Sequence, residues 1–400
     1  MNKRPGALPD LLREVLGSPL CVACGACVGY CPYVVARGDM VARVAECGQA
    51  EGRCYRNCPR SAGVHGRPLA GDAGYAGPLG ELSAALMVRE ARAATATSAA
   101  GGAANAVSAA VDHEVGQTAG AEVAGGVRQH GGTVTALMEY ALDSGVIDAA
   151  VLTRWDADDP FCAPSTFLAE TRDAVLTAGG SKFAVAPTLA VVNEAVKRGY
   201  RRLGVVALPC QATALRKMLL TETQEAPAGV ALVIGLFCTW SLGQRGWADL
   251  LARYVGDRSV RKVDIPPPPA QIMEVELIGG GRVEIPLDEV RDAVRDACRF
   301  CTDMTSENAD LAVGLVEGVE GWNTVLVRTE VGRALLVAAE EAGVVEVQPL
   351  DPERLAHLRG ASLGKKRRAV AEASSSELQS PYVAQLRGYS EEVERDAVSS

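Results

Sequence analysis

The chain has 400 residues, of which 48% are hydrophobic, 22% charged and 4% aromatic; this composition suits two or three globular domains with cores of Ala, Val and Leu. The net charge is −9, and there is no long basic stripe apart from residues 365–368, which argues against nucleic acid as the main partner. The start lacks the apolar segment of a signal peptide, and the longest apolar run is about half of the roughly 20 residues that a bilayer span needs. We therefore expect a cytoplasmic protein without a transmembrane segment, whose 12 cysteines serve metal or redox chemistry rather than disulfides.

Residues 1–66 are predicted to form a ferredoxin-like iron–sulfur module. The first four cysteines and the proline after them have the bacterial ferredoxin spacing C-x2-C-x2-C-x3-C-P: Cys21, Cys24, Cys27, Cys31 and Pro32. Three closely spaced thiolates bind one [4Fe–4S] cluster in such modules, and the distant Cys-Pro pair, Cys58 and Pro59, can supply the fourth ligand. A zinc site is the alternative, but zinc requires neither the third closely spaced cysteine nor the second Cys-Pro pair.

The second half of this module departs from the ferredoxin pattern. Cys47 and Cys54 are separated by six residues, and Ala50 or Glu51 stands where the partner of a second C-x2-C pair would fall. With Cys31 they supply only three thiolates. These could hold a [3Fe–4S] cluster, a [4Fe–4S] cluster with a non-cysteine ligand such as Glu51, or no cluster.

A linker and a larger domain follow the module. Residues 67–126 are predicted to be a linker and entry segment, and from about residue 91 to residue 126 the chain is rich in Ala, Gly, Ser and Thr. In residues 127–350 helical and strand patterns alternate, which predicts an α/β domain with a mostly parallel sheet. The predicted helices lie near 134–142, 187–199, 211–220, 244–255 and 331–342. The predicted strands are 147–153, 203–208, 229–237, 310–316 and 324–328.

Two further features concern the later part of the chain. Residues 273–277 and 282–285, joined by three glycines, predict an inserted β-hairpin. Residues 351–400 are predicted to be a charged, partly mobile tail, with the serines at 374–376 as its most mobile part.

Four further cysteines are predicted to meet at one edge of the sheet. Cys210 and Cys238 each follow a predicted strand, and the carboxyl ends of strands are where open α/β sheets bind ligands. Cys298 and Cys301 add a C-x2-C pair. The four could form a four-thiolate site, or Cys210 and Cys238 could be ordinary buried cysteines beside an unrelated pair. The spacing alone does not decide between these alternatives.

Several long strings of the main domain, among them SKFAVAPTLAVVNEAVKRGYRRLGVVALPCQATALRKM, ACRFCTDMTSENADLAVG and GWNTVLVRTEVGRALL, resemble the coenzyme F420 hydrogenase/dehydrogenase beta-subunit family. The resemblance covers roughly residues 78–350, and several members of the family carry an N-terminal ferredoxin module. It implies an α/β (overall α+β) fold in which residues 127–350 bind FAD and a [4Fe–4S] cluster. The implied cluster ligands are Cys210, Cys238, Cys298 and Cys301.

The resemblance also implies where FAD lies. The residues that match the family's motifs are Gly131, Gly132, Thr133, Thr135, Ser181, Lys182, Asn323 and Thr324. The first four open a predicted helix, where a phosphate can approach free backbone N–H groups and the positive helix end. Without the family, a Gly-Gly pair before a helix more commonly marks a tight turn, and Lys182 could equally be a solvated loop residue.

The resemblance implies one electron-transfer scheme. Coenzyme F420 is a deazaflavin that moves a hydride, iron–sulfur clusters pass single electrons, and FAD can do both. We expect hydride exchange between F420 and FAD, then transfer through two [4Fe–4S] clusters, with a third possible site at Cys31, Cys47 and Cys54, to a partner redox protein or catalytic subunit. The alternatives are a beta subunit of an F420-reducing hydrogenase or formate dehydrogenase, a ferredoxin-dependent reductase of an organic substrate, or a metal-stabilised interaction module without turnover.

Overall fold

A computed structural model describes residues 7–30, 32–49, 51–61, 76–91, 131–156, 159, 163–224, 228–267, 269–315 and 318–399. Cys31 therefore lies outside the described residues, and so does most of the predicted linker. None of the described helices is long and apolar enough to cross a lipid bilayer.

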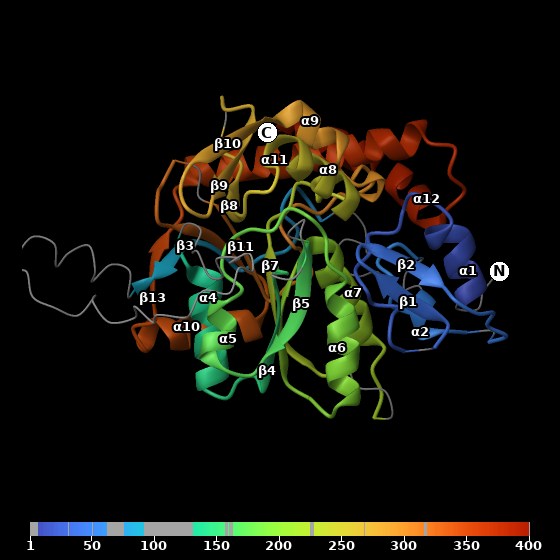
Figure 1. The fold of residues 1–400 in the computed structure, drawn as a ribbon, viewed down its shortest axis with the longest axis horizontal. Helices are drawn as coiled ribbons and strands as arrows, with labels where there is room; N and C mark the ends of the chain where they lie inside the picture. The colour runs from blue at the N-terminus through green and yellow to red at the C-terminus, as the bar shows by residue number, and fades with distance from the viewer. Residues whose placement is uncertain are drawn as a thin grey trace, which may run out of the picture.

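An eight-stranded sheet forms the centre of the molecule (Figure 1). Its strands follow the spatial order β13-β3-β12-β11-β7-β6-β4-β5. They are β3 (Ala84–Glu90), β4 (Ala149–Trp155), β5 (Pro164–Ala169), β6 (Leu203–Ala207), β7 (Val230–Leu236), β11 (Leu311–Leu315), β12 (Asn323–Val327) and β13 (Val345–Pro349).

The sheet is parallel in its centre and antiparallel on both flanks. Strand β11 pairs in parallel with β7, β7 with β6, and β6 with β4. The four remaining pairings are antiparallel. The prediction of a mostly parallel sheet is therefore right for the central strands and wrong for the flanks. The reason is visible in the connections: short segments join β4 to β5 and β11 to β12, whereas parallel neighbours require a longer crossover.

Helices cover both faces of the large sheet. Helices α4 (Thr133–Asp143), α5 (Arg172–Leu176) and α10 (Glu330–Glu341) pack on one face, and α6 (Thr188–Lys197) and α7 (Pro209–Leu220) pack on the other. Strand β4 shows the alternation that this layering requires. Its residues Ala150 and Leu152 join the first core, and Ala149 and Val151 join the second. The predicted helices and strands of this region are confirmed, with ends shifted by a few residues.

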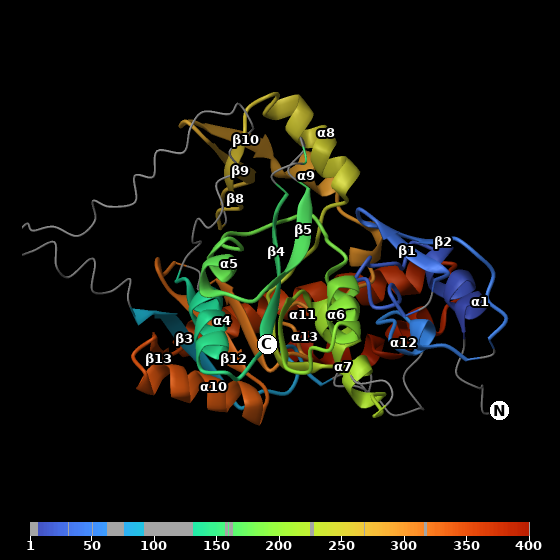
Figure 2. The same cartoon turned by 60° about the horizontal axis from the view of Figure 1, so that its bottom comes forward.

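A smaller sheet lies at one end of the large one (Figure 2). Strands β9 (Ile272–Leu277) and β10 (Arg282–Pro286) form the predicted hairpin, and β8 (Val260–Asp264) adds a third antiparallel strand. Helices α8 (Gln244–Tyr254) and α9 (Leu287–Asp292) pack on it, and a 3-10 turn at Asp296–Cys298 follows.

The N-terminal and C-terminal segments pack together. The N-terminal segment contains α1 (Leu8–Leu11), a π-helical turn (Leu12–Leu16), β1 (Val34–Arg37), β2 (Met40–Arg43) and α2 (Arg53–Arg56). The predicted tail is helical along most of its length, as α11 (Pro352–Ser375), α12 (Pro381–Gly388) and α13 (Ser390–Ser399). Side chains of α12 and of the N-terminal segment share one hydrophobic core, so α12 lies beside α1 (Figure 1).

Candidate functional site

A cavity of about 1110 Å³ lies at the carboxyl edge of the parallel strands. Residues at the ends of β4, β6, β7 and β11 line it, together with the start of β12. Because β12 runs antiparallel to β11, its first residues reach the same edge as the last residues of β11. The cavity therefore occupies the position where open α/β sheets bind ligands.

Seven of the eight residues predicted to contact the flavin line this single cavity. They are Gly132, Thr133, Thr135, Ser181, Lys182, Asn323 and Thr324. Gly131 lies directly behind them: a Cβ atom at this position would approach the Asn323 side-chain oxygen to 2.8 Å and the Gly321 carbonyl to 2.9 Å. Gly132 precedes α4 with a φ of 68°, a left-handed conformation that favours glycine. The glycine pair therefore allows the start of α4 to approach β12 closely.

Three of these side chains also have structural hydrogen bonds. The buried hydroxyl of Thr133 donates to the Val88 carbonyl at 2.8 Å, which ties the start of α4 to β3. The Asn323 side-chain amide donates to the Gly314 carbonyl at 3.2 Å, and the Thr324 hydroxyl donates to the Leu315 carbonyl at 3.3 Å. These bonds cross from β12 to β11 and fix the floor of the cavity.

Lys182 places its ammonium group inward although its side chain as a whole is only partly buried. The Nζ atom donates to the carbonyl oxygens of Ala178, Gly179 and Gly180 at 2.6, 2.8 and 2.9 Å. Burial lowers the pKa of Lys182 to about 7. The lysine therefore organises the loop that lines the cavity and changes its charge near neutral pH.

The sequence did not predict the other walls of the cavity. Arg354 and His357 reach it from α11, in the segment expected to be a mobile tail. Phe183 and Trp240 line it as a tilted aromatic pair with ring centroids 6.2 Å apart. Pro266, after β8, lines it from the smaller sheet. These other walls of the cavity thus come from four parts of the chain that are far apart in sequence: α11, Phe183, Trp240 and the segment after β8.

The cysteines Cys210, Cys238, Cys298 and Cys301, here called the second cysteine set, are brought together beside this cavity. Burial raises the pKa of Cys210, and the neighbouring thiols of Cys301, Cys238 and Cys298 contribute to its environment. Burial also raises the pKa of Cys238 to about 12. Cys238 itself lines the cavity, so the second cysteine set and the cavity share a wall.

Two buried cations face the second cysteine set. The Lys365 ammonium group donates to the Cys238 carbonyl at 2.6 Å and to the Asp303 carbonyl at 2.8 Å. The Arg60 guanidinium donates to the carbonyls of Ala297 and Phe300, each at 3.4 Å, on either side of Cys298. Burial raises the pKa of Cys301, but Lys365 and Arg60 together bring it below the usual value. Both cations thus favour thiolate at Cys301.

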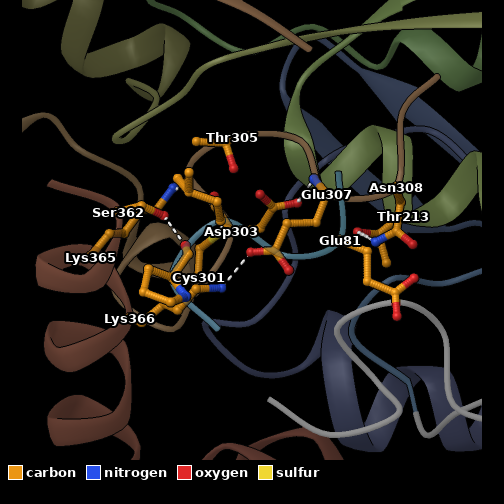
Figure 3. A network of polar contacts seen from close by, with 12 residues as sticks. Glu81, Thr213, Cys301, Asp303, Thr305, Glu307, Asn308, Ser362, Lys365 and Lys366 are labelled. Atoms are coloured by element: carbon orange, nitrogen blue, oxygen red, sulfur yellow. Dashed lines mark hydrogen bonds and ion pairs between the residues drawn. The ribbon is translucent and has the colours of Figure 1, made fainter. Parts of the chain in front are cut away.

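Figure 3 shows how α11 reaches this set through a network of polar contacts. Lys366 forms a buried ion pair with Glu307, and the Asp303 carboxylate accepts from the Glu307 backbone N–H at 2.9 Å. Ser362 donates to the Pro78 carbonyl at 2.6 Å. Lys365 and Lys366 belong to the basic run noted in the sequence, yet each is only 4% exposed. Half of that run therefore lies in the interior, which residue type alone could not reveal.

The cysteines Cys21, Cys24, Cys27 and Cys58, here called the first cysteine set, also lie together. Burial raises the pKa of Cys24, and the nearby thiols of Cys58 and Cys27 raise it further. Burial likewise raises the pKa of Cys58 to about 11. Backbone N–H groups of the loop point at the sulfurs, with Ala23 donating to Cys21 and Ala26 to Cys24. Such a loop presents donors that favour the charged thiolates which iron binds.

The third predicted site is only partly described. Cys31 lies outside the described residues. Burial raises the pKa of Cys27 most, and the neighbouring thiols of Cys58, Cys21 and Cys54 raise it further, in that order. Cys54 is therefore close to Cys27, and it is itself buried. Cys47 is half-buried and packs against the same hydrophobic core as Cys54. The structure thus places Cys54 near the first cysteine set.

The two cysteine sets adjoin each other. Cys210 of the second cysteine set is among the thiols that raise the pKa of Cys24, after burial and the nearer cysteines. The loop around Cys24 rests directly on α6: a Cβ atom on Gly25 would approach the Pro187 carbonyl to 2.6 Å. Asn193 of α6 donates to the Val28 carbonyl at 2.6 Å. The first cysteine set is therefore docked onto the α/β domain rather than tethered to it.

The donor chemistry of both sets fits iron–sulfur clusters. Each set offers four free cysteines, and buried cations or backbone N–H groups accompany them. Among the described residues, no group of three or more His, Cys, Asp or Glu side chains could hold a single metal ion. Four thiolates around a [4Fe–4S] cluster need not converge on one ion, because each binds a different iron.

Two models of protein families match the chain, and both describe the beta subunit of coenzyme F420 hydrogenase/dehydrogenase. The model of its N-terminal part matches residues 119–193, and the model of its C-terminal part matches residues 200–353. The chain is 30% identical to the coenzyme F420 hydrogenase subunit beta of Methanothermobacter thermautotrophicus, over 64% of this chain and 92% of that protein. It is 26% identical to the coenzyme F420-dependent sulfite reductase of Methanocaldococcus jannaschii, over 87% of this chain and 50% of that protein.

A solved structure supports the same similarity. One chain of the F420-reducing [NiFe] hydrogenase complex from Methanosarcina barkeri matches with a TM-score of 0.61 and 25% sequence identity. The match covers 76% of this chain and 98% of that one. The two chains therefore share a fold over most of their lengths.

Proposed function

Because the chain belongs to the coenzyme F420 hydrogenase/dehydrogenase beta-subunit family, we propose that it is an iron–sulfur flavoprotein that oxidises or reduces coenzyme F420. As a member of this family it is an oxidoreductase of the beta-subunit type. The observation that carries the proposal is the shared wall at Cys238, where a cavity lined by residues of the family's motifs meets a cluster of four cysteines.

The cavity suits FAD and a second planar ligand. Its volume of about 1110 Å³ exceeds the usual range for one small-molecule ligand, which ends near 1,000 Å³. The start of α4 offers backbone N–H groups and a positive helix end to a diphosphate, and Lys182 adds a cation nearby. Phe183 and Trp240 offer aromatic surfaces to a ring system. Bound FAD would supply the conversion between a two-electron hydride step and single-electron steps.

The cysteine sets would hold two [4Fe–4S] clusters in series from the cavity. Cys210, Cys238, Cys298 and Cys301 would bind the cluster next to the flavin. Cys21, Cys24, Cys27 and Cys58 would bind the next one, and the electrostatic influence of the Cys210 thiol on Cys24 supports this order. The iron content of the purified protein would show whether Cys31, Cys47 and Cys54 bind a third cluster.

The second part of the proposal is a partner protein, and the comparisons support it. The solved structure that resembles the chain is part of a hydrogenase complex, which favours a catalytic subunit as the partner. The sulfite reductase match spans 87% of the chain and extends well beyond residues 119–353, which favours a reductase with its own second substrate. We give the partner-subunit role first place because that match covers 98% of the solved chain.

The test is anaerobic purification followed by iron, sulfide and flavin analysis, with an F420H2 bleaching assay on the same sample. We expect one FAD, about eight irons for two [4Fe–4S] clusters, and bleaching of the flavin by F420H2. About eleven or twelve irons would add the third cluster. Zinc without flavin would overturn the proposal. Iron and FAD that respond only to reduced ferredoxin would replace F420 with ferredoxin as the electron source.

A further inference from the structure

Arg60 is the buried cation that touches both cysteine sets. Its own backbone N–H donates to the Cys58 sulfur at 3.4 Å, within the first cysteine set. Its guanidinium donates to the Ala297 and Phe300 carbonyls at 3.4 Å, which flank Cys298 of the second cysteine set. The residue is 4% exposed, and its charge also lies close enough to act on the thiol of Cys21.

Side chains from elsewhere hold the Arg60 guanidinium in place without neutralising it. The Tyr382 hydroxyl of α12 forms a short hydrogen bond with it, and the Tyr382 ring lies 4.5 Å from the guanidinium carbon. Arg295, which also lies near Cys21, pairs with Asp39 at 2.5 Å. Among the described residues no carboxylate pairs with Arg60, and the anionic groups that offset its burial are thiolates of the second cysteine set.

Two other buried cations each serve a single set. The Lys217 ammonium group donates to the Cys58 carbonyl at 2.9 Å and to the Ser61 carbonyl at 3.2 Å, within the N-terminal segment. Lys365 donates to the Cys238 carbonyl in the second cysteine set. Lys217 therefore lies beside the first cysteine set, Lys365 beside the second, and Arg60 between the two, so the three residues can be compared directly.

We propose that Arg60 is a positioning residue that sets the reduction potentials of both iron–sulfur centres together. The inference rests on the proposed function, because it requires clusters at both cysteine sets. Reduction adds a negative charge to a cluster, so a buried positive charge stabilises the reduced state and raises the potential. A single charge between two centres raises both, and the cation at one set raises mainly its own.

The test is a redox titration of the cluster-loaded protein, followed by electron paramagnetic resonance, on Arg60→Met, Arg60→Lys, Lys217→Met and Lys365→Met. We expect Arg60→Met to lower the reduced-to-oxidised ratio of both centres at least tenfold at a fixed potential, a shift of about 59 mV for a one-electron couple. Lys217→Met should shift only the first centre and Lys365→Met only the second. Arg60→Lys keeps the charge and should leave both centres within about threefold of the unsubstituted protein.

The outcomes separate this inference from the function on which it rests. Two clusters in the unsubstituted protein, with Arg60→Met shifting one centre or neither, overturn the inference and leave the proposed function intact. An unsubstituted protein without two clusters overturns both. If Arg60→Met fails to fold, Arg60→Lys and Arg60→Gln replace it, and equal potentials in those two variants contradict the role of the charge.

Discussion

Lys182 is the cavity residue whose charge changes nearest neutral pH. Burial lowers its pKa to about 7, so the ammonium loses its proton as the pH rises through this value. Its neutral form is favoured by folding relative to the unfolded chain, whose lysine pKa is near 10.4, so Lys182 contributes stability that grows between about pH 7 and pH 10. Its attraction for an anionic ligand instead decreases as the pH rises, because the ammonium form predominates only below about pH 7.

We expect Lys182→Met to weaken FAD binding about tenfold at pH 6, because the positive charge of the ammonium, whose donors are used by the loop carbonyls, then no longer attracts the anionic diphosphate. In the unsubstituted protein, binding should weaken between pH 6 and pH 8, and the variant should lose this pH dependence. Flavin fluorescence during equilibrium dialysis measures both effects. Lys182→Arg is the control that keeps a cation, and an unchanged pH profile in Lys182→Met would contradict the role of the lysine.

Cys238 is the residue at which the cavity and the second cysteine set meet. We expect Cys238→Ser to remove the irons of one cluster while the flavin content stays near one per chain, because the cavity is lined by many other residues. Iron and flavin analysis of the purified variant measures this. Cys47→Ser is the matched control because it should leave both four-cysteine centres loaded. A Cys238→Ser variant that keeps the irons of both these centres would contradict the assignment.

At the scale of single residues, the sequence predicted the clustered cysteines and most of the motif residues that line the cavity, but not the cations beside the cysteines. Cysteine spacing is a direct signature because cluster ligands are nearly always cysteine. Arg60 follows the Cys58-Pro59 pair, and Lys365 sits in a basic run, and both positions look like ordinary surface charge. Only the fold shows that both are buried.

Helix α11 contacts the second cysteine set through Lys365 and also forms a buried ion pair through Lys366 and Glu307. Lys366 and Glu307 are 4% and 7% exposed, and their charges compensate each other. Burial raises the pKa of Glu307, and the ammonium of Lys366 opposes this. Removing one partner would leave the other charge buried and unpaired, which costs about 3–5 kcal/mol.

We expect Lys366→Met to lower the unfolding free energy of the cofactor-loaded protein by about 3–5 kcal/mol, because Glu307 then lacks its partner. The double variant Lys366→Met with Glu307→Leu should recover most of this loss. Anaerobic thermal unfolding measures both proteins, with Arg367→Met as the control because Arg367 pairs with Glu394 at the surface. A single variant that is as stable as this control would contradict the argument.

At the scale of elements, periodicity predicted the regular helices and strands well and missed those with weak patterns. Strand β3 falls within residues 67–126, which are predicted from the sequence to be a linker and entry segment, and β5 and β13 are the two edge strands of the large sheet. Helix α11 escaped prediction because its inward face carries lysines instead of apolar residues alone. Tertiary contacts with the second cysteine set, rather than amphipathicity, determine its position.

For the molecule as a whole, the contact with α6 holds the first cysteine set beside the second cysteine set. Gly25 has a φ of 86° and no room for a Cβ atom against the Pro187 carbonyl. We expect Gly25→Ala to lose the irons of the first cysteine set while flavin and the second centre remain, as measured by metal analysis and visible absorption. Gly48→Ala is the control, because a Cβ atom there meets nothing within 4 Å. Equal iron content in both variants would contradict this contact.

The order of residues along the chain has a consequence for synthesis. The apolar core of the N-terminal segment is completed by Ala373, Val383 and Leu386, which follow Leu8 and Leu11 by nearly the whole length of the chain. A segment that leaves the ribosome first must therefore wait for the last helices before its core can close. Contacts of such large sequence separation slow folding. Until α12 is made, the core that contains Cys27, Cys54 and Cys58 is incomplete, so we expect any insertion of a cluster at these cysteines to compete with completion of the chain.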